Sequence, residues 1–198
     1  MSVLVLTVDQ RDSRRGRDQV PTALELLGGV AALRSFERTA GDELQGVLDD
    51  PAALPAAVEP LLRAGTWSIG IGVGPVDLPL PPHARAGAGP AYLHARAGVT
   101  AAKTSPWHLR VVGERPGARQ LESALWLWAA VLARRTPRGW EVADLADTGL
   151  SYDEAARRLG ISQSAVSQRA QAAGIVEGRR ARELVTHLAT TALEEARG

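Results

Sequence analysis

The sequence predicts an α+β protein in which a mixed domain over residues 1–115 is followed by an all-α domain over residues 119–198. Residues 3–112 alternate short runs rich in Val, Ile and Leu with segments of helical spacing, which favours a sheet with helices packed on it. After that point apolar residues recur only at helical spacing. A segment rich in Pro and Gly, residues 113–117, separates the two parts and is typical of a linker.

The N-terminal part begins with a continuous apolar run at residues 3–8, which predicts a buried strand. Residues 35–40 and 43–47 flank Gly41-Asp42, which predicts a hairpin with a tight turn. The other expected elements are a helix at 21–27, a helix at 52–64, a strand with alternating Gly at 67–73, a loop at 75–89, a helix at 91–102 and a strand at 107–112. This β-α-β-β-α-β order, with additional elements, predicts a ferredoxin-like or palm sheet.

Two carboxylates occupy neighbouring places in that sheet. Asp9 follows the first strand, and Asp42 lies in the hairpin turn, so we expect both at one edge. Paired carboxylates can hold Mg²⁺, which prefers oxygen ligands and bridges to nucleotide phosphates. The alternative is that both are ordinary turn residues, because Asp is common at strand ends and hairpin tips.

A basic run follows the first strand and includes Arg14, Arg15 and Arg17. Such a run is usually a solvated surface. Because it lies beside Asp9, it could instead contact a triphosphate through charge-assisted hydrogen bonds. Arg14 is therefore a candidate nucleotide-binding residue.

The C-terminal part contains a predicted helix-turn-helix at residues 151–174. Ser151 with Glu154 three residues later forms a capping-box pattern, and Gly160 can end the first helix with a positive φ. Ser162 can cap the second helix. Ala155, Ala156, Leu159, Ile161, Val166 and Ala170 supply apolar positions for packing the two helices together.

The second helix would present a polar face that can hydrogen-bond base edges in a major groove. This face consists of Gln163, Ser164, Ser167, Gln168, Arg169 and Gln171. Residues 157–182 contain six arginines and one acid, a basic patch suited to phosphates, to which Arg179 and Arg180 belong. Double-stranded DNA is therefore the predicted partner; the alternative is a structural helical hairpin with a polar surface. Arg169 stands where many helix-turn-helix sequences have a third apolar residue, and Ala170 could take its packing role.

Three more helices are expected at residues 119–135, 140–147 and 180–196. They could pack around the helix-turn-helix as its own core. Alternatively, the Trp-rich helix at 119–135 or the last helix could form a dimer interface. We expect a homodimer, because bacterial operators commonly contain two half-sites bound by a two-fold dimer.

Composition is ordinary for a globular protein, with 45% hydrophobic and 23% charged residues in 198. No apolar run approaches the roughly 20 residues of a membrane-spanning helix, and the N-terminal segment lacks the features of a secretory signal. The chain contains no cysteine, which excludes disulfides and thiolate metal sites. We therefore expect a cytoplasmic protein with no membrane partner.

Three segments resemble the SatD family of bacterial proteins. They are Gly41-Asp-Glu-Leu-Gln-Gly46, Ile69-Gly-Ile-Gly72 and Gly89-Pro-Ala-Tyr-Leu-His-Ala-Arg96. In the same order they resemble, more distantly, the catalytic domain of class III nucleotide cyclases. The resemblance covers roughly residues 3–112 and implies a nucleotide-cyclase-like form of the palm sheet.

The resemblance also implies roles for individual residues. By the cyclase pattern, Asp9 and Asp42 match the two metal-binding aspartates, and Arg96 matches the arginine that stabilises the transferring phosphoryl group. Tyr92 stands where that pattern has Asn. Mg²⁺ and a nucleotide are the implied ligands. Two hypotheses follow: a DNA-binding transcriptional regulator whose N-terminal domain senses a nucleotide, or a nucleotidyl cyclase or related phosphoryl-transfer enzyme with accessory helices.

Overall fold

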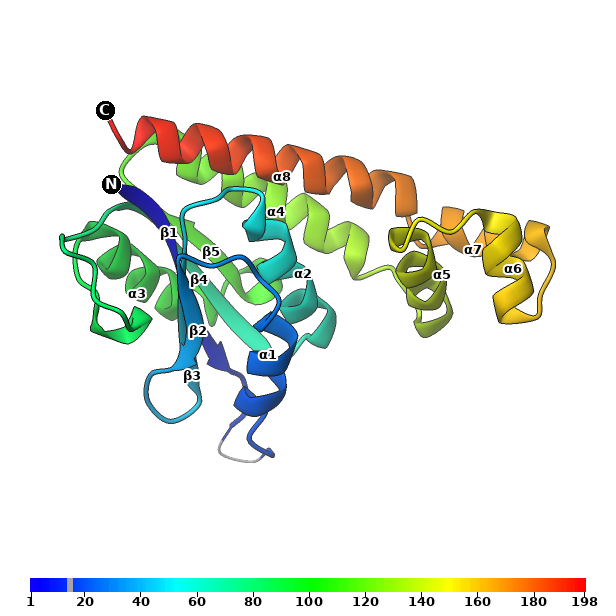
Figure 1. The fold of residues 1–198 in the computed structure, drawn as a ribbon, viewed down its shortest axis with the longest axis horizontal. Helices are drawn as coiled ribbons and strands as arrows, with labels where there is room; N and C mark the ends of the chain where they lie inside the picture. Colours follow the sequence, from blue (N-terminus) through cyan, green and yellow to red (C-terminus); the bar gives the residue numbers. More distant parts are fainter. Residues whose placement is uncertain (14–15) are drawn as a thin grey trace.

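The computed structural model describes residues 1–13 and 16–198. Arg14, one of the predicted nucleotide-binding residues, lies outside the described residues. The described chain forms one five-stranded mixed sheet and eight α-helices, so it is a mixed α and β protein (Figure 1). The expected strands and helices are confirmed apart from their ends. None of the described helices combines the length and the apolar character needed to cross a membrane.

The sheet has the strand order β2-β3-β1-β4-β5. Its strands are β1 (Ser2–Gln10), β2 (Arg34–Arg38), β3 (Glu43–Leu48), β4 (Trp67–Pro75) and β5 (Leu109–Val112). The central strand β1 is antiparallel to both β3 and β4, β2 is antiparallel to β3, and β5 is parallel to β4. Leu6 of β1 lies between Gly46 and Ile71. The last strand starts two residues later than predicted, because Pro106–His108 form a 3-10 turn.

One face of the sheet is covered by α3 (Pro90–Ala102). The alternating glycines of β4 allow this close approach. A Cβ atom on Gly72 would lie 2.0 Å from the carbonyl oxygen of Ala91, and one on Gly70 would lie 2.1 Å from the amide nitrogen of Val99. The alternating Gly of the sequence is therefore a helix-docking surface.

The opposite face is covered by α1 (Val20–Leu27), α2 (Ala53–Ala64), α4 (Pro116–Leu132) and α8 (Ile175–Glu195). These helices share one apolar core with the sheet. Burial of large side chains in such a core is the main favourable contribution to folding. Its fully buried members include Leu4, Leu6, Leu54, Leu121, Leu125, Trp128 and Val185.

The remaining helices form a smaller unit with a separate core. They are α5 (Pro137–Asp147), α6 (Tyr152–Leu159) and α7 (Gln163–Ala172), and they extend beyond one end of the α4–α8 pair (Figure 1). Their core includes Val142, Ala155, Val166 and Ala170, together with Ile175 at the start of α8. We call α5–α7 the helical unit and the rest of the described chain the sheet unit.

The boundary between the two cores differs from the predicted boundary near residues 115–119. The long helix α4 and most of α8 pack on the sheet instead of forming a core around the helix-turn-helix. Trp128 is fully buried in the sheet core, as is Val185. Helical periodicity specifies an apolar face but not the surface that covers it, and here the sheet covers it.

Candidate functional site

The helix-turn-helix segment has the local structure that its sequence predicts. The Ser151 amide donates to Glu154 Oε2 at 2.8 Å, and the Glu154 amide donates to Ser151 Oγ at 3.3 Å, which completes the capping box. Gly160 has φ 65° and ends α6 in the left-handed region. The Ser162 hydroxyl accepts from the Ala165 amide at 3.2 Å and caps α7.

Packing inside the helical unit fixes which face of α7 points outward. Val166 is fully buried, and Ala170, four residues later, is 3% exposed. Ile161, between α6 and α7, is half-buried against the same core. Since residues four apart lie on one helix face, the opposite face of α7 is directed away from the protein.

Most of the predicted base-reading residues lie on the exposed surface of α7, with Ser164, Gln168 and Gln171 on this outward face. Gln163, Ser164, Ser167, Gln168 and Gln171 are exposed. Arg169 is half-buried, and its guanidinium lies 3.9 Å from the Glu141 carboxylate. Ala170 takes the packing role that Arg169 cannot fill, as the sequence suggested.

The predicted phosphate-contacting arginines are exposed and also have protein partners. Arg179 donates to the carbonyl oxygen of Ala146 at 2.9 Å, and Arg180 pairs with Glu183 at 2.8 Å. Arg157 and Arg158 are exposed near the end of α6 and were not predicted as site residues. The basic window of residues 157–182 contained the signal that could have identified them.

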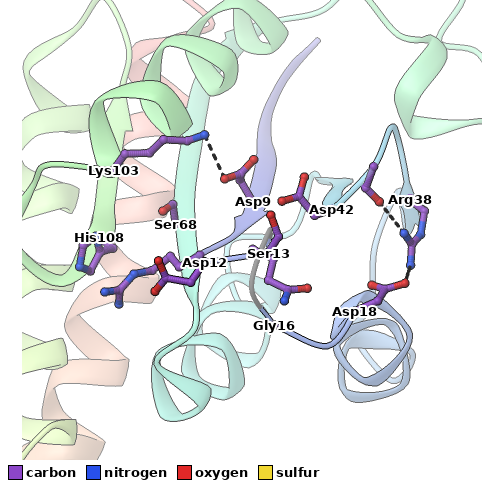
Figure 2. A pocket seen from close by; sticks show the side chains of 13 residues that line it. Asp9, Asp12, Ser13, Gly16, Asp18, Arg38, Asp42, Ser68, Lys103 and His108 are labelled. Carbon is purple, nitrogen blue, oxygen red and sulfur yellow. Dashed lines mark hydrogen bonds and ion pairs between the residues drawn. The ribbon is translucent and has the colours of Figure 1, made fainter.

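A second candidate site is a cavity of about 1080 Å³ at the end of β1. Asp9 and Asp42 both line this cavity, and their carboxylates are drawn next to each other in Figure 2. The Gln10 amide donates to the Asp42 carbonyl oxygen at 3.1 Å, which anchors the hairpin turn to the end of β1. The remaining lining residues are Gln10, Arg11, Asp12, Ser13, Gly16, Asp18, Arg38, Gly41, Ser68, Lys103 and His108.

Asp9 already has a cationic partner in this cavity. The Lys103 ammonium lies 3.0 Å from the Asp9 carboxylate, whose side chain is 20% exposed. Lys103 is the single lysine of the chain and directly follows α3. Sequence analysis missed it, since its distance from Asp9 depends on how α3 docks on β4.

The cavity contains both signs of charge. Arg38 pairs with Asp18 at 2.5 Å. The hydrogen bond from Arg38, followed by the one from the Val20 amide, lowers the pKa of Asp18 below its usual range. Arg11 and Lys103 add further cations, so the cavity could receive an anionic group beside its carboxylates.

Arg96 does not line this cavity. Its guanidinium lies 3.1 Å from Glu43, which also accepts a 2.7 Å hydrogen bond from the Thr39 hydroxyl. Of the two predicted nucleotide-binding arginines, the structure therefore pairs Arg96 with Glu43 and does not describe Arg14.

The donor set at Asp9 and Asp42 fits part of a magnesium coordination shell. Two carboxylates with open space around them suit Mg²⁺, which usually keeps several waters and binds substrate phosphates. Within residues 1–13 and 16–198, no group of three or more His, Cys, Asp or Glu side chains is arranged to hold a metal ion. The other ligands would therefore have to come from water or from a phosphate.

Backbone strain gathers around the same cavity. In the part of the chain that the structure describes, the non-glycine residues with positive φ are Asp12, Trp107 and His108, with φ of 56°, 58° and 47°. Asp12 and His108 line the cavity, and Trp107 precedes His108. Such backbone conformations cost free energy, and the cost is larger for a bulky residue such as Trp. They are found most often at functional sites.

No family model, curated protein or solved structure matches this chain closely enough to identify a relative.

Proposed function

We propose that this protein is a DNA-binding transcriptional regulator in which α7 is the recognition helix. The observation that carries the proposal is the exposed polar surface of α7, where Ser164, Gln168 and Gln171 lie opposite the buried Val166 and Ala170 and where Gln163 and Ser167 are also exposed. Gln and Ser side chains can contact base edges in the major groove, while nearby arginines contact phosphates.

The test is binding to genomic DNA fragments, with sequence preference measured by selection and sequencing. The double variant Gln163→Ala/Gln168→Ala should lose sequence preference but retain salt-dependent, non-specific binding through the arginines. Gln120→Ala, which changes an exposed glutamine on α4, is the matched control. Unchanged sequence preference in the double variant would contradict the assignment of α7.

The sheet unit is, in this proposal, a SatD-like domain of ferredoxin-like or palm architecture. Strands β1–β4 with α1 and α2 follow the β-α-β-β-α-β order, and adjacent strands among these four are antiparallel. Strand β5, parallel to β4, extends that arrangement. These features support the assignment that the three sequence segments suggested.

The cavity at Asp9 and Asp42 is the proposed effector site. The two carboxylates would hold Mg²⁺, and Lys103 with Arg11 would contact the phosphates of a nucleotide. Arg96 remains a candidate only if it leaves Glu43, and Arg14 remains a sequence-based candidate. Isothermal titration of nucleoside triphosphates with Mg²⁺, compared between the parent chain and Asp42→Ala, tests this part.

The regulator is proposed to act in the cytoplasm as a homodimer on two DNA half-sites. With Trp128 and Val185 committed to the sheet core, an interface on α4 or α8 would use their outer faces, where Leu127 and Leu184 are exposed. Analytical ultracentrifugation with and without a two-half-site DNA duplex measures the stoichiometry directly.

A phosphoryl-transfer enzyme is the second candidate, favoured by the adjacent Asp9 and Asp42. Incubation with nucleoside triphosphates and Mg²⁺ or Mn²⁺ distinguishes the two. Turnover that Asp42→Ala abolishes would favour the enzyme, whereas saturable nucleotide binding without turnover would favour the sensor.

A further inference from the structure

Charged side chains join the helical unit to the sheet unit, beside the apolar contacts of Trp140 and Ile175. The two apolar cores are separate, and Trp140 is a half-buried side chain that packs against both. Between the units, Arg63 of α2 donates two hydrogen bonds to Asp144 of α5, at 2.7 and 3.0 Å. Paired bonds of this type between a guanidinium and a carboxylate fix orientation as well as distance.

Glu59, one turn before Arg63 on α2, binds two further arginines. One of its carboxylate oxygens lies 3.3 Å from Arg135, and the other accepts a hydrogen bond from Arg182. Arg182 also lies 3.2 Å from Asp147, the last residue of α5. Glu59 is therefore linked to α5 through Arg182.

Arg135 connects Glu59 to the residue that ends the recognition helix. Its side chain is 5% exposed, and its Nε donates to the carbonyl oxygen of Ala173, directly after α7, at 3.1 Å. The guanidinium carbons of Arg63 and Arg135 lie 4.3 and 4.6 Å from the Trp140 ring centroid, within cation–π range.

Because Arg135 and Arg182 are partly or largely buried, the loss of the Glu59 carboxylate should destabilise both of them. Burial lowers the pKa of Arg135, and the Glu59 carboxylate partly opposes that effect. For Arg182, burial acts in the same direction, but Glu59 and Asp147 outweigh it and raise its pKa. A buried cation that loses its carboxylate partner is strongly unfavourable, so Glu59 stabilises two arginines at once.

The covalent connections between the units lie close together. The end of α4 and the start of α8 are neighbours, since a Cβ atom on Gly174 would lie 3.0 Å from Val131. Because the two connections are adjacent, they limit rotation of the helical unit less than contacts further away from them do. Arg63 on α2 supplies such a contact by binding Asp144, and Glu59 supports a second one by binding Arg182, which also pairs with Asp147.

We propose that Glu59 and Arg63 are positioning residues that hold the helical unit, and with it α7, in one orientation on the sheet unit. The consequence for DNA binding rests on the proposed function, whereas the orientation itself does not. The end of α2 is linked to the cavity lining through Arg11, whose Nη1 donates to the Gly65 carbonyl oxygen at 3.1 Å. The positioning helix is thus connected to the proposed effector site by this hydrogen bond.

The experiment measures the orientation directly. Because the chain contains no cysteine, spin labels can be placed specifically on Glu25→Cys in α1 and Asp153→Cys in α6, both exposed positions. Double electron–electron resonance of the full-length chain should give one narrow distance distribution. In Arg63→Gln and in Glu59→Gln the distribution should broaden or shift.

Matched variants separate positioning from general damage. Arg63→Asp combined with Asp144→Arg should restore the narrow distribution, since it reverses the pair. Glu37→Gln, which alters the carboxylate that is hydrogen-bonded to His83 within the sheet unit, should leave the distribution unchanged. Glu59→Gln leaves the buried Arg135 without its carboxylate, so Arg63→Gln provides the measurement if that variant unfolds.

DNA binding is measured on the same proteins without labels. We expect Arg63→Gln to weaken specific binding by about fivefold or more, the lower end of typical coupling between sites. An unchanged distance distribution in Arg63→Gln would overturn the proposal. A broadened distribution in a chain that does not bind DNA would support positioning and contradict the proposed function.

Discussion

The Lys103 ammonium lies 3.0 Å from the Asp9 carboxylate, so the single lysine of the chain already neutralises one of the two predicted metal ligands. Both side chains are partly exposed, and an exposed ion pair of this kind contributes about 0.2–1 kcal/mol. A divalent cation that binds Asp9 and Asp42 must displace Lys103 or share Asp9 with it. Lys103 therefore competes with a metal ion, and it becomes available to a phosphate when the metal displaces it.

Removing the lysine charge should therefore strengthen metal binding. We expect Lys103→Gln to bind Mn²⁺ about two- to fivefold more tightly than the parent chain, which corresponds to the contribution of an exposed ion pair. Electron paramagnetic resonance of free Mn²⁺ gives the dissociation constants. Lys103→Arg should resemble the parent, and Asp42→Asn should bind weakly or not at all. Equal affinity in the Gln and Arg variants would show that Lys103 does not compete.

Gly72 should be intolerant of any side chain. A Cβ atom there would lie 2.0 Å from the Ala91 carbonyl oxygen, and backbone atoms cannot move aside as a flexible side chain can. We expect Gly72→Ala to lower the free energy of unfolding by about 3 kcal/mol or more, at or beyond the upper end of overpacking costs. Urea denaturation followed by circular dichroism measures the change.

The control is Gly29→Ala, because a Cβ atom on Gly29 meets nothing within 4 Å. Its free energy of unfolding should change by less than about 1 kcal/mol. Similar losses in both variants would indicate that α3 can shift away from β4.

Glycine should be required at position 160 because of its backbone conformation, and not because a side chain there would clash with its neighbours. It has φ 65°, and a Cβ atom there would have no neighbour within 4 Å. We expect Gly160→Ala to destabilise the chain by about 1–2 kcal/mol, the cost of a left-handed conformation for an ordinary residue. Gly160→Asn should cost less, since Asn adopts this conformation more readily. Thermal unfolding of the three proteins, at one concentration, tests that order.

The helix-turn-helix was predictable because its signals are short-range. Ser151, Glu154, Gly160 and Ser162 each act within one helical turn, so the sequence alone contains the information for the caps and the turn. The burial of Val166 follows from periodicity in the same segment. These local rules predict the exposed polar face of α7 without knowledge of the rest of the chain.

The partners of the long helices were not predictable in the same way. An apolar face on α4 fits the sheet, the helical unit or a second copy of the chain equally well. The choice depends on surfaces distant in sequence, such as β1 and α2. Consequently Trp128 was correctly expected on an apolar helix, while its place in the sheet core was not foreseen.

The cavity also combines features that the local sequence predicts with features that depend on long-range packing. The adjacency of Asp9 and Asp42 follows from a strand end and a hairpin turn, both visible in the sequence. The Lys103–Asp9 and Arg96–Glu43 pairs depend instead on how α3 docks on β4, which the glycines at 70 and 72 permit. Long-range docking therefore decides which charges meet at this site.

The capping box of α6 should make the helical unit sensitive to acid. The hydrogen bond from the Ser151 side chain, followed by that from the Ser151 amide, lowers the pKa of Glu154 from its usual 4.5. A carboxyl group whose pKa is lower in the folded state contributes stability that is complete above the unfolded pKa. That contribution is lost as the pH falls through the folded pKa. The stabilisation by Glu154 should therefore be constant near neutral pH and decline below pH 4.5.

Glu154→Gln removes the titrating group while keeping a side chain of similar shape. Near neutral pH, we expect this variant to have a lower free energy of unfolding than the parent chain, because a neutral amide accepts the Ser151 hydrogen bonds less strongly than a carboxylate. The difference should shrink as the pH falls below 4.5. Urea denaturation of both proteins across the acidic range measures it, with Asp153→Asn, an exposed neighbour in α6, as the control. A difference that stays constant or grows in acid would mean that Glu154 does not have a lowered pKa, and that the capping box stabilises α6 through its geometry alone.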